Sequence, residues 1–233
     1  MVRKSNGRLH TAGLASAEPP SAVHARSPRT RRRDRQRDAI LRAAARLFRE
    51  RGFADTGMRD IAAAADLSAA NLYHYFAGKH DLLFYCQDRA LDRMLDAVAA
   101  ARKASRSAAE RLRLVFTAHL QTLLDEIEGA SAHLQIDSLP PPMREAIVRK
   151  RDRYEHALRR IIVEGIAAGE LVDVHPAIVA RAALGAMNWT VTWFRPEGSD
   201  SAGAVGEVIS RFLVRGVAAR TPAARRAFPV VNR

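Results

Sequence analysis

A short stretch of the sequence, SAANLYHYFAGKHDLL at residues 68–83, gathers side chains that could do chemistry or recognise a partner. Tyr73, His74 and Tyr75 are consecutive there, although aromatic residues make up only 6% of the chain. Hydroxyl and imidazole groups can hydrogen-bond to nucleic acids, and imidazoles also bind metals. His74 and His80 are six residues apart, which does not put two ligands on one face of a helix, so we expect no metal site.

The periodicity of this stretch predicts a short helix over residues 69–76 with two different faces. Ser68 can cap its amino end, and Leu72 and Phe76, four residues apart, share its inner face. The outer face carries small and polar residues, among them Asn71 and His74. An α-helix fits the major groove of DNA, where Asn pairs best with adenine and other polar side chains reach base edges. We therefore interpret the helix as a DNA-recognition helix.

Two further helices must hold the recognition helix in place. An apolar stripe predicts one helix over residues 35–51, which Gly52 ends. A second helix fits Met58–Ala64, and a three-residue connection leads from it to Ser68. Asp66 in that connection takes a position where glycine is usual, and Asp tolerates a positive φ there. The three helices would share a core of Ile40, Leu47, Phe48, Ile61, Leu72 and Phe76.

Residues 34–83 resemble the DNA-binding domain of the TetR family of bacterial regulators. The matching residues are Thr56, Ile61-Ala62, Ala65-Asp66-Leu67-Ser68, Leu72-Tyr73, Phe76, Lys79 and Leu82. Two departures are Gly57, where Ser or Thr is usual, and Asp66. The resemblance implies that the chain is not an enzyme but binds a palindromic double-stranded operator. The expected DNA contacts are Thr56, Arg59, Ser68, Ala69, Ala70, Asn71, Tyr73, His74, Tyr75 and Lys79. Core positions for the two tyrosines and a solvated Lys79 are the alternatives.

The remaining sequence predicts helices throughout, and thus an all-α fold of about nine helices. A long connecting helix fits 80–103, and further helices fit 107–128, 131–138, 142–168, 175–194 and 202–217. Pro142 can start the 142–168 helix. We divide the chain into a disordered basic arm (1–33), the DNA-binding domain (34–83), a helical ligand-binding and dimerisation domain (84–220) and a tail (221–233).

The second half carries the features of a dimerising, ligand-binding domain. Trp189 and Trp193 stand four residues apart on an apolar helix, which would be covered by a second copy or by the monomer's own core. The stretch GAMNWTVTWFRPEG at 185–198 resembles TetR relatives that regulate lipid or aromatic-acid catabolism, several of which respond to acyl-CoA thioesters. That resemblance implies a small hydrophobic effector such as an acyl-CoA. The expected ligand contacts are Phe116, His119, Leu120, Leu123, Tyr154 and Trp189.

Composition limits the possible partners. The formal net charge is +13 and the pI about 11.1, and residues 1–37 hold ten Lys/Arg against two acidic residues. Such a balance favours nucleic acid as a partner. The single Cys86, together with the lack of a secretory signal or membrane span, favours the bacterial cytoplasm, and no cofactor is expected. The leading hypothesis is a homodimeric, ligand-responsive repressor, with activation left open. A basic protein that coats DNA without sequence preference is the alternative.

Overall fold

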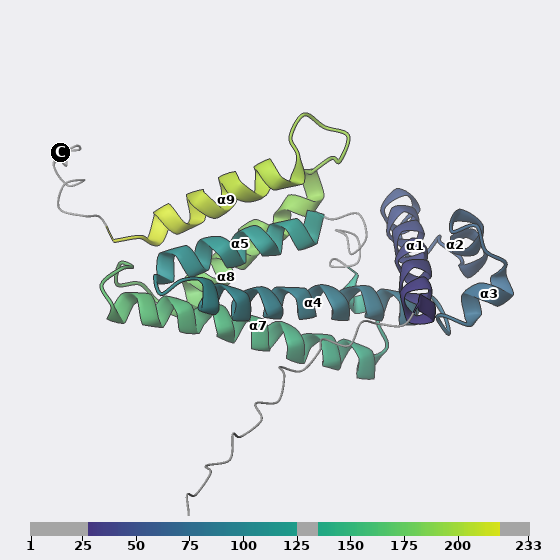
Figure 1. The fold of residues 1–233 in the computed structure, drawn as a ribbon, viewed down its shortest axis with the longest axis horizontal. Helices are drawn as coiled ribbons and strands as arrows, with labels where there is room; N and C mark the ends of the chain where they lie inside the picture. Colours follow the sequence, from purple (N-terminus) through teal and green to yellow (C-terminus); the bar gives the residue numbers. More distant parts are fainter. Residues whose placement is uncertain (1–27, 125–134, 220–233) are drawn as a thin grey trace, which may run out of the picture.

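The computed structural model describes residues 28–124 and 135–219, and within these ranges the chain is helical (Figure 1). No strand forms in the described part of the chain, where Leu171 and Ala218 make an isolated β-bridge. The elements are α1 (Pro28–Arg51), α2 (Met58–Ala64), α3 (Ala69–Tyr73), α4 (Lys79–Ala104), α5 (Ala108–Leu124), the 3₁₀ helix η1 (Ile136–Ser138), α7 (Pro141–Ala167), α8 (Pro176–Trp193) and α9 (Ala202–Val217).

The helices form two regions that α4 joins. Figure 1 shows α1, α2 and α3 at one end of the molecule and α5, α7, α8 and α9 layered along the rest of α4. The 26 residues of α4 span about 39 Å at the usual helical rise. Helix α5 lies at the centre of the larger region, because it packs against α4, α7, α8 and α9. A displacement in the larger region therefore has a continuous helical path to the smaller one.

Several local expectations are confirmed. Helices α2 and α9 have the predicted bounds, and the six residues expected in the small core are all buried. Gly52 ends α1 with φ +82°, the left-handed conformation that glycine adopts without strain. Asp66 has φ +55°, so it replaces glycine in the α2–α3 turn while keeping the backbone that the turn needs.

The predicted carboxyl-terminal boundary of the basic arm, residue 33, is wrong. Helix α1 begins at Pro28, so residues 28–33 of the predicted arm are helical. The apolar stripe begins only at Ile40, and periodicity could not reveal the polar turns before it. Arginine is a good helix former and proline is favoured at a helix start, which explains the extension. Residues 1–27 and the predicted tail at 221–233 lie outside the described residues.

Other predicted bounds also differ from the structure, most of them by one residue. Helix α3 ends at Tyr73 rather than at residue 76, and α7 starts one proline earlier than expected, at Pro141. In the predicted 131–138 helix, only the 3₁₀ turn at Ile136–Ser138 is described, since 125–134 lie outside the described residues. Helix α4 runs unbroken across the division at 83/84, so no linker separates the two regions there. None of the described helices is both long and apolar enough to cross a membrane.

Candidate nucleic-acid interface

Helix α3 is anchored from beneath by apolar and aromatic contacts. Leu72 and Phe76 are buried, as the helical wheel predicts. The Phe76 ring makes an edge contact with Tyr85 of α4, with 5.5 Å between centroids. The guanidinium carbon of Arg37 in α1 lies 5.2 Å from the Tyr85 centroid and 5.8 Å from that of Phe76, within cation–π range. These contacts join α1, α4 and the end of α3 into one support.

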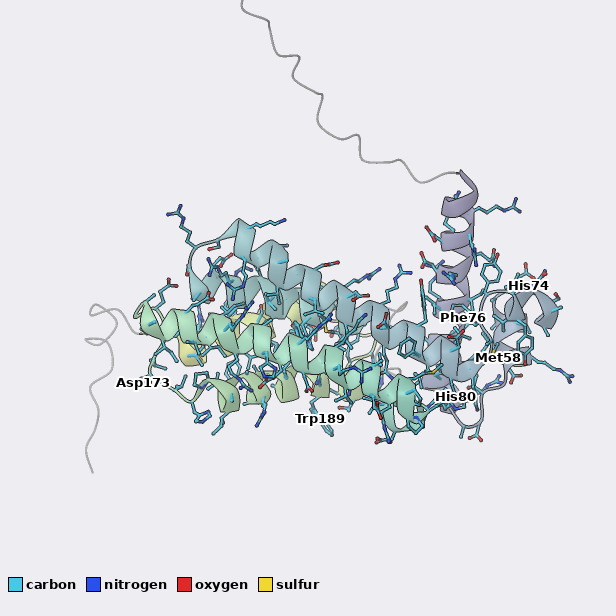
Figure 2. All side chains as sticks on the ribbon, turned by 90° about the horizontal axis from the view of Figure 1, so that it is seen from below. Met58, His74, Phe76, His80, Asp173 and Trp189 are labelled. Atoms are coloured by element: carbon cyan, nitrogen blue, oxygen red, sulfur yellow. The ribbon has the colours of Figure 1, made fainter. Side chains whose placement is uncertain are left out.

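The outer face of α3 is open to solvent. Ser68 caps the helix, since its Oγ accepts a hydrogen bond of 3.2 Å from the backbone N–H of Asn71. Ala70, Asn71 and His74 are exposed, and 54% of Tyr73 is exposed. His74 lies at the outer end of the molecule in Figure 2. Ala69 is half-buried beside them, and Arg59 is exposed on α2.

The early end of α3 changes the geometry of the last aromatic residues. His74 is the C-cap, and the N–H of Tyr75 donates to the carbonyl of Leu72 at 2.9 Å in a tighter turn. Tyr75 is half-buried and packs against the core. Its ring therefore supports the domain while part of the residue stays accessible to solvent.

Two expected DNA contacts are placed differently. The Thr56 side chain is 1% exposed and its hydroxyl donates to the carbonyl of Gly52 at 2.8 Å, so it faces the interior. The ammonium of Lys79 donates to the carbonyls of Phe53, Ala54 and Thr56 at 2.9, 3.0 and 3.4 Å. An ammonium has three donors, and these carbonyls occupy them. Both residues thus hold the α1–α2 loop instead of presenting a free group to a phosphate.

A groove beside α3 involves residues that sequence reasoning missed. Its lining joins Arg32, Arg33 and Gln36 of α1 to Leu67, Asn71, His74 and Tyr75. The signal was the run of arginines at 31–33, but the sequence assigned it to a disordered arm. Asp66 lines a second hollow with Arg42 and Arg46 of α1, apart from the residues of α3.

The expected ligand contacts divide into a buried group and one exposed residue. Phe116, His119, Leu120 and Leu123 of α5 and Tyr154 of α7 are all buried. The rings of His119 and Tyr154 stack with centroids 5.6 Å apart. Trp189, in contrast, is 67% exposed and lies at the edge of the molecule in Figure 2, so its placement as a pocket residue is wrong. Helix α8 turns that side chain outward because Met187 and Thr190 occupy its buried face.

A polar network crosses the interior of the larger region. His119 Nδ1 lies 3.1 Å from the Tyr154 hydroxyl, and His119 Nε2 lies 3.1 Å from Oδ1 of Asn188, a partner that sequence reasoning missed. The amide oxygen can only accept, so Nε2 carries the hydrogen and Nδ1 accepts from the tyrosine. Burial lowers the pKa of His119 to about 4, against a smaller opposing effect of the Asn188 hydrogen bond. Burial also raises the pKa of Tyr154.

Large apolar side chains are exposed on α8 and α9. They are Ile178, Trp189 and Trp193 of α8 and Val208 and Phe212 of α9. Phe212 alone is 74% exposed. Large apolar side chains exposed in such number on two helices are a feature of protein contact sites.

Helix α2, the turn at Asp66 and the capped, outward-facing α3 form a helix-turn-helix of the DNA-binding type, mounted on a helical body. Comparison with known proteins agrees. Residues 40–86 match the family model described as bacterial regulatory proteins, tetR family, and residues 105–217 match the tetracyclin repressor-like C-terminal domain.

Individual relatives extend over most of the chain. The transcriptional repressor KstR2 of Mycolicibacterium smegmatis is 27% identical over 78% of this chain and 90% of its own length. The fatty acid metabolism regulator protein of Bacillus subtilis is 25% identical over 76% of this chain and 93% of its own length. Among solved structures, the regulator PfmR of Thermus thermophilus is 33% identical over 76% of this chain and 97% of that chain, with a TM-score of 0.69.

A further solved structure is that of AibR in complex with isovaleryl coenzyme A and operator DNA. It is 26% identical to this chain, the match covers 77% of this chain and 96% of that chain, and the TM-score is 0.63. The chain belongs to the TetR family of bacterial transcriptional regulators.

Proposed function

We propose that the protein is a homodimeric repressor that reads a palindromic operator with α3 of each subunit and is released by a small hydrophobic effector. The observation that carries the DNA-binding role is the outer face of α3, where Asn71, Tyr73 and His74 stand exposed above buried Leu72. Ala70 is small enough to let the helix backbone approach base edges. In this geometry Asn71 and His74 read bases, and the half-sites lie about 34–36 Å apart.

The apolar surface of α8 and α9 supports dimerisation. Two copies of these helices, packed as a four-helix bundle, would remove Trp189 and Phe212 from water. Burial of apolar area contributes about 25 cal/mol per Å², which favours association strongly for aromatic side chains of this size. A two-fold dimer would also explain a palindromic operator, because each half-site meets an identical recognition helix.

The effector site is proposed in the larger region, near the buried group that includes Phe116, His119 and Tyr154. Two observations support an acyl-CoA or a related lipid: a relative is named for fatty acid metabolism, and AibR was solved with isovaleryl coenzyme A. The effector would act by binding one arrangement of the dimer more tightly than another. Helix α4 would transmit the difference, because it packs on α5 and α7 and reaches α1.

Binding of the full chain to DNA tests this function. Fluorescence anisotropy would compare a duplex from the region upstream of its own gene, chosen for a palindrome, with random-sequence duplex. A repressor should prefer its site by roughly 10³-fold or more. Equal affinities would point to non-specific DNA coating. Adding isovaleryl-CoA and longer acyl-CoA thioesters to the specific complex should release the DNA, while coenzyme A alone should not.

His74→Ala and Tyr73→Ala test the placement of the recognition surface. Both side chains are exposed, so the variants should stay folded and dimeric while operator affinity falls. Unchanged affinity in both variants would remove α3 from the interface.

A further inference from the structure

We infer that the amino-terminal turns of α1 and the outer edge of α3 form a single phosphate-binding groove, in which Arg32 and Arg33 hold one DNA strand. This inference rests on the proposed DNA-binding function and adds a second contact surface to it. The strand would lie between the two helices, while the exposed face of α3 enters the major groove beside it.

The lining of the groove fits this occupant. One wall carries Arg32, Arg33 and Gln36, and the other carries Asn71 and His74. Residues 32 and 36 are one turn apart, and 33 and 36 are three apart, so the three side chains share a side of α1. The wall formed by α3 is the one that already faces DNA in the proposed complex. Any duplex seated on α3 therefore brings its backbone to the arginines.

The charge of this part of α1 favours a polyanion. Residues 31–37 contain five arginines and one aspartate, Asp34, so their net charge is +4. The side chains of Arg32 and Arg33 are exposed, and guanidinium groups bind phosphate oxygens in a bidentate manner. Charge complementarity of this kind distinguishes DNA from an apolar or cationic partner.

The part of α1 that carries these arginines is held in a fixed position relative to α3. Arg37 stacks on the Phe76 and Tyr85 rings, and Asp38 forms an ion pair of 2.7 Å with Arg89 of α4. These two adjacent residues lock the helix directly after the groove. A contact from a fixed helix costs less ordering entropy on binding than a contact from a flexible arm. The contact should therefore add to the affinity for DNA of any sequence, because phosphate contacts position the protein and carry no information about the bases.

The salt dependence of binding tests the groove. The double variant Arg32→Gln/Arg33→Gln would be compared with the wild-type full chain on the upstream palindromic duplex and on a random-sequence duplex. Each lost phosphate contact lowers the slope of log K against log salt by about 0.9, so loss of two contacts per subunit lowers a dimer's slope by about 3.6. The affinity for both duplexes should fall by a similar factor.

Matched variants separate specific contact from general charge. Lys103→Gln/Arg106→Gln removes the same charge from exposed residues at and just beyond the opposite end of α4, and its slope should stay close to that of the wild type. Arg32→Lys/Arg33→Lys keeps the charges and should restore most of the slope. If the two glutamine variants change the slope equally, the proposed phosphate-binding role of the groove is wrong, while the proposed DNA-binding function stands. If the wild type binds neither duplex, the proposed function falls together with the groove.

Discussion

The Lys79 ammonium lies 2.9 Å from the carbonyl oxygen of Phe53 and 4.7 Å from the centroid of that residue's ring. A cation at the first position of α4 opposes the helix dipole. The carbonyls of the α1–α2 loop and the aromatic face offset that cost. The start of the connecting helix is thereby fastened to the loop that precedes the helix-turn-helix. This gives the lysine a positioning role between the two regions.

Lys79→Met should lower the stability of the region formed by α1, α2 and α3 without removing a contact to a DNA phosphate. Hydrogen bonds to charged groups contribute about 1.5–3 kcal/mol each when buried, and these are only partly buried, so we expect a loss of about 2–3 kcal/mol in the free energy of unfolding. Urea denaturation would measure it. The salt slope of DNA binding should stay unchanged, whereas loss of a phosphate contact would lower it by about 0.9 per subunit. Lys103→Met, exposed at the far end of α4, is the control.

His119 should make the stability of the larger region depend on pH. Its pKa is about 4 in the folded protein and about 6.5 when unfolded. Between these values the unfolded chain binds the extra proton, so the free energy of unfolding is highest above pH 6.5 and falls as the pH drops toward 4. At 1.36 kcal/mol per unit, the loss between pH 7 and 5 is about 2 kcal/mol.

His119→Gln should flatten that dependence. Urea titrations at pH 5, 6 and 7 and constant ionic strength would give the slope. The variant loses some stability at every pH because the His119 hydrogen bonds to Tyr154 and Asn188 are changed, so the comparison is between slopes. His156→Gln, at an exposed position of α7, is the matched variant with which the slope of His119→Gln is compared. The assignment to His119 is wrong if its variant keeps the full slope.

Much of the fold could be predicted from local patterns. The stripe containing Ile40, Leu47 and Phe48, the glycine at 52 and the serine cap at 68 each report on their own helix, and the structure agrees with them. The positive φ of Asp66 also followed from its place in a short connection. These features depend on neighbours in the chain, which is why sequence reasoning reaches them.

The wrong predictions of side-chain placement arise mainly where contacts between distant parts of the chain determine the direction of the side chain. Lys79 pairs with carbonyls 23 to 26 residues away, and no spacing rule points to them. Trp189 looks like a pocket residue by type, but the rotation of α8 against α5 and α7 turns it outward. Thr56 is a more local case, because its hydroxyl donates to the carbonyl of Gly52 four residues back and lies 3.3 Å from that of Leu47 in α1. For Lys79 and Trp189, packing between elements far apart in the chain determines where the side chain points.

Substitutions at Asp66 should report the cost of the left-handed turn. Glycine adopts φ +55° without strain, whereas alanine pays a steric cost of about 1 kcal/mol there. We expect Asp66→Ala to lower the free energy of unfolding by about 1 kcal/mol and Asp66→Gly to change it by less than about 0.5 kcal/mol. The neighbouring Ala65 has φ −97°, so Ala65→Gly should be destabilising. Equal effects of Ala and Gly at position 66 would contradict the turn assignment.

Phe212→Glu should separate the proposed dimer into folded monomers. The ring is 74% exposed in one subunit, so the carboxylate is tolerated in the monomer but is buried without a partner when α8 and α9 meet a second copy. Sedimentation at micromolar concentration would give the mass, and circular dichroism would confirm the helix content. Val163→Glu places the same charge at a half-exposed valine of α7 and should leave the dimer intact. Operator affinity should fall with the dimer, since one α3 then reads one half-site. A dimeric Phe212→Glu protein would move the interface away from α9.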